Sequence, residues 1–504
     1  MDESDDGRTV PPRSTGISGL DDILNGGFPA NQLYLLEGSP GTGKTTLALQ
    51  FLMEGVRQGE TVLYVTLSET RRELLAVGRS HGWSLDGLHI HEMEPLEESL
   101  SPDHQLTMFH PSELELTETT QRVLRQVEEL KPSRVVFDSL SEMRLLAQSS
   151  LRYRRQILAL KQFFAGRQAT VLLLDDLTGP GDDQQLQSIC HGVVRLEQLA
   201  TEYGAERRRL RVLKLRATQF RGGLHDFVLR KGGLDVFPRL VASEHHADFS
   251  ELELSSGNPG LDRLLGGGLQ AGSSTLLVGP AGTGKSSVCM SVCIAAAARG
   301  ERSALFLFDE TISMLKIRSR SLGLPVDTYI DAGLITLRQI EPAELSPGEF
   351  AASVRRAVEG KDDNGRPAKL VVIDSLNGYL LSMAEEKQLT SQLHELFKYT
   401  SQQGALAIVT LSQAGMVGPM SSPVDSTYLA DTVILFRNFE SFGHLRRAIS
   451  VIKKRSGPHE LTLREFRLSS GGLSLSEPLE DFQGVLTGVP TYHGKGDRGN
   501  RNEP

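Results

Sequence analysis

Gly38-Ser39-Pro40-Gly41-Thr42-Gly43-Lys44-Thr45 is the stretch that decides the fold. It matches the pattern G-x-x-x-x-G-K-[ST], in which glycines let the backbone curl so that its N–H groups face phosphate oxygens. The apolar run Leu33-Tyr34-Leu35-Leu36 precedes it, and a helix-forming segment follows it. A strand, a glycine-rich loop and a helix in that order are the context that a phosphate-binding loop (P-loop) requires. The sequence therefore predicts a nucleoside triphosphate site, the alternative being a glycine turn without a ligand.

The chain repeats this stretch as Gly279-Pro280-Ala281-Gly282-Thr283-Gly284-Lys285-Ser286, with Lys285 lying 241 residues after Lys44 (44 to 285). The run Ser274-Thr275-Leu276-Leu277-Val278 precedes the second loop. Upstream, Gly16-Ile17-Ser18-Gly19-Leu20-Asp21 recurs as Gly257-Asn258-Pro259-Gly260-Leu261-Asp262 at the same spacing. A period of this size is one domain length rather than a solenoid repeat, so the chain contains two tandem domains.

Each loop residue type has an expected role at an ATP site. Lys44 and Lys285 neutralise the β- and γ-phosphates, Thr45 and Ser286 place a hydroxyl on Mg²⁺, and the helix N-terminus adds partial positive charge. The predicted ATP-binding residues are Gly38, Ser39, Pro40, Gly41, Thr42, Gly43, Lys44, Thr45 and Thr46 in the first half, and Gly279, Pro280, Ala281, Gly282, Thr283, Gly284, Lys285, Ser286 and Ser287 in the second.

Two aspartates are the further candidates for holding Mg²⁺. Asp138 ends the apolar run Val135-Val136-Phe137, and Asp374 ends the run Val371-Val372-Ile373. An aspartate there lies at the carboxyl edge of a parallel sheet, beside the phosphates, and can hold the metal through water. The alternative for each residue alone is a helix N-cap.

Short apolar runs that alternate with helical segments indicate buried parallel strands. We therefore expect an α/β fold with two tandem P-loop NTPase domains, each a mostly parallel, twisted sheet flanked by helices. The expected boundaries are a disordered segment at 1–13, a first domain at 14–244, a second at 245–490 and a disordered tail at 491–504.

Composition and charge bear on the location of the protein and on the partners that it is not expected to bind. The 504 residues carry a net charge of −9, with 54 Lys and Arg against 63 Asp and Glu, so no global attraction to nucleic acid or membrane is expected. Met1 to Pro12 contain no apolar stretch typical of a signal peptide, and no apolar run reaches the length of a membrane span. The three cysteines form no disulfide framework. We expect a cytoplasmic protein.

The doubled domain, the G-x-x-G-L-D segments, the strands that end in Asp-Ser and the late Lys-x-Arg segments together resemble the KaiC family of the RecA superfamily, over about residues 14–492. The resemblance implies a double-ring homohexamer with ATP between neighbouring subunits, slow ATP hydrolysis and, in some members, Ser/Thr autophosphorylation. Regulatory or signalling proteins are the expected partners beside the chain itself.

The resemblance also implies a pair of adjacent carboxylates after the second strand, the first of them acting as general base. The second half has Asp309-Glu310 there, whereas the first half has Ser68-Glu69. A serine cannot take a proton at neutral pH without help, so we hypothesise that the second site is the better catalyst and that the first hydrolyses ATP poorly unless Glu69 substitutes. For Glu69 and Glu310 the alternative is a solvated strand end.

Four cations complete the predicted catalytic residues. Lys214 and Arg216 share a face of a strand because they lie two residues apart, and Lys453 and Arg455 have the same spacing. The resemblance places such side chains on a neighbouring subunit's γ-phosphate, where they would stabilise developing charge. A basic strand facing solvent is the alternative.

Autophosphorylation has one candidate acceptor, Thr427, which lies before Asp431-Thr432. The clock member of the family has a Ser-Thr pair where this chain has Thr427-Tyr428, so the paired acceptor is broken, and a polar turn explains the segment equally well. The competing function is a DNA-acting RecA-like recombinase or helicase, which the basic stretch Arg207-Arg208-Arg209-Leu210-Arg211 favours. A scaffold with negligible turnover is the third alternative.

Overall fold

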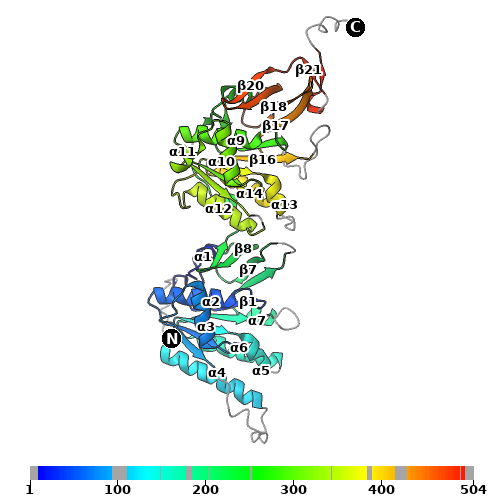
Figure 1. The fold of residues 1–504 in the computed structure, drawn as a ribbon. Helices are drawn as coiled ribbons and strands as arrows, with labels where there is room; N and C mark the ends of the chain where they lie inside the picture. The colour runs from blue at the N-terminus through cyan, green and yellow to red at the C-terminus, as the bar shows by residue number, and fades with distance from the viewer. Residues whose placement is uncertain are drawn as a thin grey trace. The chain divides into compact units, whose positions relative to one another are not determined.

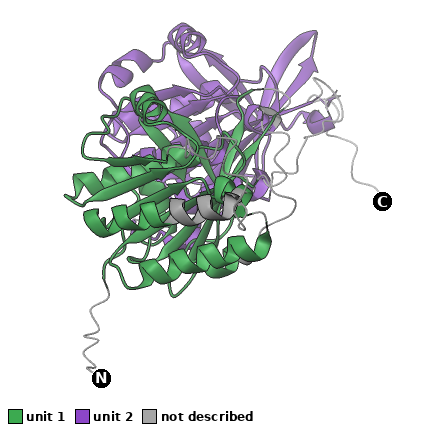
Figure 2. Cartoon of the chain, turned by 90° about the horizontal axis from the view of Figure 1, so that it is seen from below, with its two compact units in different colours: residues 1–239 green, residues 240–504 purple. Residues whose placement is uncertain are grey.

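A computed structural model describes residues 10–93, 111–147, 149–177, 184–201, 204–249, 252–341, 343–382, 389–414, 428–487 and 490–493. The chain forms two compact units, residues 1–239 and 240–504, which Figure 2 colours separately.

The first unit alternates strands and helices before it ends in a run of strands. Its helices are α1 (Ser18–Ile23), α2 (Lys44–Arg57), α3 (Arg71–His81), α4 (Pro111–Leu130), α5 (Leu140–Ala147), α6 (Ser150–Ala165) and α7 (Gln184–Ile189). Its strands are β1 (Leu33–Gly38), β2 (Val62–Thr66), β3 (His89–Glu92), β4 (Arg134–Asp138), β5 (Thr170–Asp175), β6 (Gly192–Leu199), β7 (Arg207–Leu215), β8 (His225–Arg230) and β9 (Gly233–Phe237).

One nine-stranded sheet forms this unit, in the order β3-β2-β4-β5-β1-β6-β7-β8-β9. Figure 1 labels β1, β7 and β8 of this sheet. The six strands β3, β2, β4, β5, β1 and β6, in this sheet order, are parallel to one another. Strands β7, β8 and β9 extend the sheet beyond β6, and each is antiparallel to its neighbours. Because β1 lies between β5 and β6 in the parallel part, the loop after it opens at the carboxyl edge of the sheet. The ends of β4 and β5 lie at that same edge.

The alternation of side chains along β1 explains the layers. Tyr34 and Leu36 pack into the core beneath α2, whereas Leu33 and Leu35 pack into the core beneath α5 and α6. A strand buried on both faces reads as a continuous apolar run, and this is the pattern from which the strand was predicted.

The second unit repeats the arrangement. Its helices are η3 (Ala242–Glu244), α8 (Pro259–Leu264), α9 (Lys285–Ala298), α10 (Ile312–Ser321), α11 (Val326–Asp331), α12 (Pro347–Glu359), α13 (Leu376–Ser382), α14 (Leu389–Gln402) and η4 (Val485–Thr487). Its strands are β10 (Glu253–Leu254), β11 (Leu269–Gln270), β12 (Ser274–Pro280), β13 (Ser303–Leu307), β14 (Ile335–Gln339), β15 (Leu370–Asp374), β16 (Leu406–Gln413), β17 (Thr432–Ser441), β18 (His444–Lys454), β19 (Arg464–Ser469), β20 (Gly472–Pro478), β21 (Phe482–Gln483) and β22 (Thr491–Tyr492).

Its main sheet has the order β14-β13-β15-β16-β12-β17-β18-β19-β20, the same as in the first unit. The predicted fold class, two tandem RecA-like domains with mostly parallel sheets and flanking helices, is confirmed. The structure divides the chain between Arg239 and Leu240, close to the predicted boundary after residue 244. Within the segments predicted to be disordered, Arg13 pairs with Phe28, and Thr491–Tyr492 form β22.

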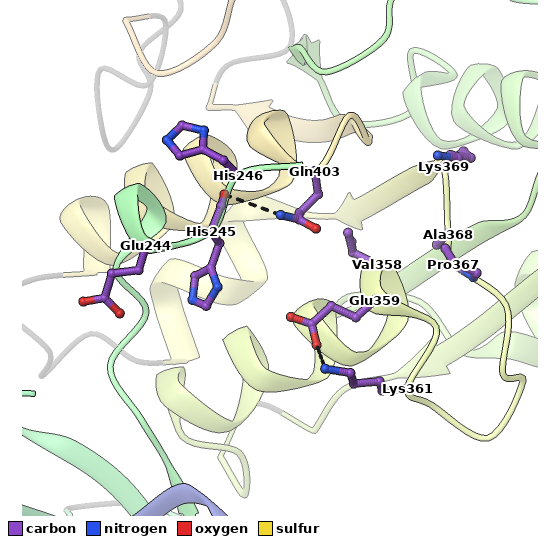
Figure 3. Close-up of a pocket in the computed structure, with 10 residues that line it drawn as sticks. All are labelled: Glu244, His245, His246, Val358, Glu359, Lys361, Pro367, Ala368, Lys369 and Gln403. Carbon is purple, nitrogen blue, oxygen red and sulfur yellow. Dashed lines mark hydrogen bonds and ion pairs between the residues drawn. The ribbon is translucent and has the colours of Figure 1, made fainter. Parts of the chain in front are cut away.

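Residues 240–249 begin the second unit, and Glu244, His245 and His246 lie at the amino edge of its sheet (Figure 3). The backbone N–H of Ala242 donates to Glu395 at 3.0 Å, and the ring of His245 meets Tyr399 with centroids 5.4 Å apart. A hollow of about 500 Å³ lies here, between this segment, the end of α12 and the residues that precede β15 and β16.

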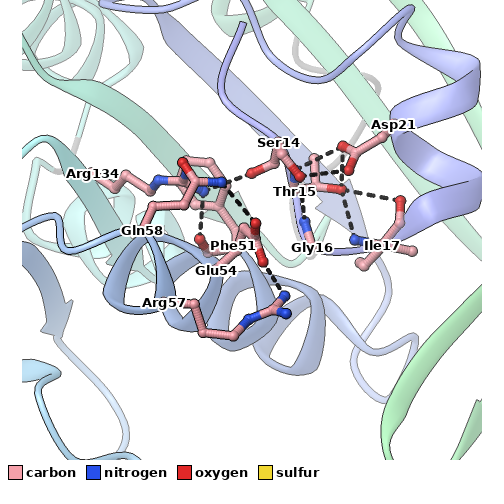
Figure 4. A network of polar contacts seen from close by, with 10 residues as sticks. All are labelled: Ser14, Thr15, Gly16, Ile17, Asp21, Phe51, Glu54, Arg57, Gln58 and Arg134. Atoms are coloured by element: carbon pink, nitrogen blue, oxygen red, sulfur yellow. Dashed lines mark hydrogen bonds and ion pairs between the residues drawn. The ribbon is translucent and has the colours of Figure 1, made fainter.

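Asp21 and Asp262 explain the repeated G-x-x-G-L-D segment. The carboxylate of Asp21 accepts hydrogen bonds from the backbone N–H of Thr15 at 2.7 Å and from the hydroxyl of Ser14 at 2.7 Å (Figure 4). Asp262 accepts the equivalent bonds from Ser256 and Ser255 at 2.7 and 2.6 Å. The motif is therefore a turn held by its own aspartate.

Arg134, at the start of β4, is buried completely and ties four segments together. Its guanidinium pairs with Glu60 at 2.5 Å and donates to the carbonyls of Ser14 at 2.6 Å and Phe51 at 2.8 Å, the latter two visible in Figure 4. In the second unit Arg302 is buried likewise and pairs with Asp362. Both arginines satisfy backbone carbonyls at the amino edge of a sheet.

Within the described part of the chain, no helix combines the length and the apolar character that crossing a membrane would need. Cys190, Cys289 and Cys293 are buried free thiols.

Candidate nucleotide-binding sites

The first P-loop has the backbone shape that phosphate binding needs. Gly41 and Gly43 adopt left-handed conformations with φ of 82° and 100°, which side chains rarely tolerate. Gly43 is the N-cap of α2, so the amino end of the helix opens on the loop. Buried Lys44 folds back over the loop, and its ammonium donates to the carbonyls of Gly38 at 2.6 Å and Ser39 at 3.0 Å.

The two predicted Mg²⁺ ligands of this site meet. The hydroxyl of Thr45 donates to the carboxylate of Asp138, which ends β4, at 3.2 Å. Tyr64, buried on β2, donates a hydrogen bond to the same carboxylate. Burial raises the pKa of Asp138, and the hydrogen bonds from Tyr64 and Thr45 oppose that rise. A hydroxyl and a carboxylate at the mouth of the loop are the oxygen donors that Mg²⁺ prefers.

Glu69 lies at the same edge of the sheet. Its backbone N–H bonds to the hydroxyl of Thr66, which ends β2, at 2.9 Å. Burial, then the negative charges of Asp138, Glu73 and Asp176, raise its pKa to about 7. One of its carboxylate oxygens is buried without a hydrogen-bond partner among the described residues. A carboxylate that titrates near neutral pH is suited to accept a proton.

The second P-loop has the same backbone. Gly282 and Gly284 have φ of 75° and 100°, and a Cβ placed on Gly282 would meet nothing within 4 Å, so the cradle is open there. The ammonium of buried Lys285 donates to the carbonyls of Gly279 at 2.9 Å and Pro280 at 2.7 Å. Burial lowers its pKa to about 8, against the opposing effect of Asp374. A buried amine surrounded by carbonyls fits an anionic phosphate.

The acidic residues around the second loop are held differently from those of the first. Asp374 ends β15 and accepts a hydrogen bond from Thr410 of β16, and no bond joins it to Ser286 within the described residues. Asp309 accepts one from Ser375, while Glu310 forms an ion pair with Arg318 of α10 at 2.7 Å. Burial raises the pKa of Glu310 and Arg318 opposes this rise. The structure thus brings both acids to the loop's edge of the sheet.

Lys214 and Arg216 lie far from the P-loop of their own unit. In the sheet register Gly38 pairs with Leu196 of β6, and Leu196 pairs with Leu210 of β7. Lys214 lies four residues farther along β7, about 13 Å from the level of the P-loop. The ammonium of Lys214 donates to the carbonyl of Gln187 at 2.6 Å, and Arg216 donates to that of Ser188 at 2.9 Å. Neither cation can reach the first site from within its own unit.

Lys453 and Arg455 have the corresponding place in the second unit. Lys453 pairs with Val433, which in turn pairs with Leu276 near the start of β12, and its ammonium donates to the carbonyl of Ala430 at 2.6 Å. Arg455 forms an ion pair with Asp431 at 3.3 Å. The candidate acceptor Thr427 lies outside the described residues.

The remaining predicted loop residues line the same turns. The hydroxyl of Thr42 donates a hydrogen bond to the carbonyl of Ser39 at 2.8 Å, within the first loop. The hydroxyl of Thr283 donates one to the carbonyl of Pro280 at 2.9 Å, within the second loop. Thr46 approaches His81 at 3.5 Å, and Ser287 lies buried in α9. The hollow of Figure 3 is at the opposite edge of the second sheet and is therefore no part of either site.

Sequence reasoning missed three residues that shape these sites. Asp176 forms an ion pair with Lys44 at 2.8 Å, and Tyr64 and Thr410 donate hydrogen bonds to Asp138 and Asp374, the predicted Mg²⁺ ligands. The signal for Asp176 was present, since the apolar strand β5 ends in Asp175 and Asp176 follows it, whereas the second half has Leu411-Ser412. Tyr64 and Thr410 look like ordinary strand residues, and only the strand order brings them to the site.

Fold and site together define a tandem RecA-like P-loop ATPase. The chain belongs to the KaiC family: the family model described as the KaiC ATPase matches residues 13–241 and again 254–480. It is similar to the circadian clock oscillator protein KaiC of Parathermosynechococcus lividus, with 26% identity over 96% of this chain and 89% of that protein. It is also similar to KaiC of Synechococcus elongatus, with 27% identity over 96% and 92%. A circadian clock protein of Synechocystis, KaiC3, is 26% identical over 98% and 96%.

Proposed function

We propose that this protein is a Mg²⁺-dependent ATPase with one nucleotide site in each unit, that it works as a homohexameric ring in the cytoplasm, and that it transmits a regulatory signal to partner proteins. The observation that carries the proposal is the pair of matching cradles, in which Lys44 and Lys285 are buried against the carbonyls of their own glycine loops. Membership of the KaiC ATPase family supports it.

The chain's own groups divide the work of phosphoryl transfer to water. The loop N–H groups and the two lysines hold the triphosphate, and Thr45 with Asp138, and Ser286 with Asp374, would hold Mg²⁺, which neutralises phosphate charge when bound. Asp309 or Glu310 takes the proton of the attacking water in the second site. Glu69 is the corresponding base in the first site, and its pKa of about 7 suits that role.

The ring is proposed because the four cations lie at the edge of the sheet opposite to their own P-loops. A Lys214–Arg216 or Lys453–Arg455 pair acts on a γ-phosphate only when a neighbouring copy presents its own loop to it. In that place the two cations stabilise charge that develops in the transition state. ATP at subunit boundaries, and turnover that requires assembly, follow from this placement.

The alternative of a DNA-acting recombinase or helicase is not adopted. The basic stretch that favoured it is engaged within the unit: Arg208 pairs with Glu206 at 3.0 Å and Arg209 with Asp226 at 3.2 Å. The net charge of −9 also opposes a nucleic-acid role. Nucleic acid is therefore not proposed as a partner.

Lys44→Ala and Lys285→Ala, made separately and together, test the function. We expect ATP-dependent assembly to appear in native mass measurements, phosphate release to fall most in Lys285→Ala, and turnover to vanish in the double variant. Undiminished turnover in the double variant would refute the ATPase proposal. A Lys44→Ala change that abolished most turnover, with little effect from Lys285→Ala, would reverse the assignment of the better site.

A further inference from the structure

Asp176 is the residue that distinguishes the first P-loop from the second. Its carboxylate lies 2.8 Å from the ammonium of Lys44, where Lys44 is 6% and Asp176 28% exposed. The hydroxyl of Ser141 donates to Asp176 at 3.1 Å and fixes it from the other side. The lysine that must neutralise phosphate charge is thus already paired with an anion of the protein.

The end of β5 is built to hold Asp176 in this place. Asp175, the last residue of β5, forms an ion pair with Arg144 of α5 at 2.8 Å. Glu37, its register partner on β1, is buried and pairs with Arg195 of β6 at 2.7 Å. These ion pairs hold the carboxyl ends of β5 and β1, and Asp176 follows directly after the first of these ends.

The second unit has no such anion at the corresponding position. In the first sheet Glu37 is the register partner of Asp175, and in the second sheet Val278 is the register partner of Leu411. The residues that follow, Asp176 and Ser412, therefore have equivalent positions. Among the described residues no carboxylate lies within ion-pair distance of Lys285, whose ammonium bonds to loop carbonyls. Beside the phosphate-binding lysine, the two cradles therefore differ by one negative charge.

A carboxylate in this position acts on the γ-phosphate in two ways. It competes for the ammonium of Lys44, and it repels the added negative charge of a triphosphate more than that of a diphosphate, because like charges at a few ångströms interact strongly in a partly buried site. Burial raises the pKa of Asp176, but the hydrogen bond and charge of Lys44 outweigh this and lower it, so the anion persists at neutral pH.

We propose that Asp176 is a specificity-determining residue of the first site, which it shifts from nucleoside triphosphate toward nucleoside diphosphate relative to the second site. The inference rests on the proposed function, since it takes Lys44 as a phosphate ligand. The first site then retains the diphosphate while the second turns over the triphosphate, and the asymmetry between the units arises from ligand preference as well as from the missing carboxylate at Ser68.

The test exchanges the two counterparts. In a Lys285→Ala chain, which leaves the first site alone, ATP and ADP affinities are measured by calorimetry with Mg²⁺ before and after Asp176→Ser. In a Lys44→Ala chain the same is done for Ser412→Asp. We expect Asp176→Ser to raise the ratio of ATP to ADP affinity by about tenfold or more and Ser412→Asp to lower it by a similar factor. Asp176→Asn, which keeps the shape, should act like Asp176→Ser, and Trp83 fluorescence confirms folding of the first unit.

An unchanged ratio in both exchanges, with both nucleotides still bound, overturns the inference and leaves the proposed function intact. Loss of ATP binding on Asp176→Ser also overturns it and assigns Asp176 to metal or phosphate binding. If neither nucleotide binds the Lys285→Ala chain with Asp176 present or replaced, the first site of the proposed function fails as well.

Discussion

Replacing Arg134 by Met should destabilise the first unit and leave the second unchanged. Methionine keeps the apolar stem but removes a guanidinium that bonds to Glu60, to Gln58 and to the carbonyls of Ser14 and Phe51. Removing one partner of a buried ion pair costs about 3–5 kcal/mol. Glu60 keeps its second partner Arg13 at 2.6 Å, so the lower figure, about 3 kcal/mol, applies. With a urea dependence of about 3 kcal/mol per molar, the midpoint should fall by about 1 M.

The sequence supplies a reporter for this experiment, because its single tryptophan, Trp83, packs against the core of the first unit. Urea unfolding followed by Trp83 fluorescence therefore reads the first unit. Arg302→Met is the matched control: it breaks the equivalent pair with Asp362 and should leave the Trp83 transition in place. Arg57→Ala, which removes an exposed pair with Glu54, should cost less than about 1 kcal/mol. A midpoint shift below about 0.3 M for Arg134→Met would refute the reasoning.

Two further predictions concern turnover, and a third concerns autophosphorylation. In a Lys285→Ala chain, phosphate release should rise as pH passes about 7, because Glu69 accepts a proton only when ionised, and Glu69→Gln should abolish that rise; a flat profile in the parent chain contradicts the role of Glu69. Lys214→Ala with Arg216→Ala should lower first-site turnover by about 10³-fold or more while ATP binding persists, and no loss in an assembled ring would exclude action across the boundary. Intact-mass measurement after incubation with ATP and Mg²⁺ tests autophosphorylation, and Thr427→Ala should remove any added phosphate if that residue is the acceptor.

Local patterns made much of the site predictable. A P-loop is eight consecutive residues, and its glycines, lysine and hydroxyl act through backbone geometry within the same short segment. The strands ending at Asp138 and Asp374 were predictable because burial on both faces leaves a continuous apolar run with an abrupt polar end. The repeat doubled this information, since each motif occurs twice at a spacing of one domain length, and it set the number of domains at two.

Other features depend on contacts between distant segments. Arg134 reads as the first residue of a strand, yet it is bound to Glu60 and Ser14, which lie 74 and 120 residues away along the chain. Asp176 reads as a polar strand end, yet the order β5-β1 places it on Lys44. Lys214 reads as part of a basic strand, and only the antiparallel pairing of β7 with β6 shows that it lies at the edge of the sheet opposite to its own P-loop.

By itself the sequence determined two P-loop domains, their strands and the lysine and hydroxyl of each cradle, because these depend on residues adjacent in the chain. The tertiary structure decided that Asp176 forms an ion pair with the lysine of the first P-loop. Ser412 lies at the corresponding place in the second unit. Strand order and register set that difference, because they bring together side chains that lie far apart in the sequence.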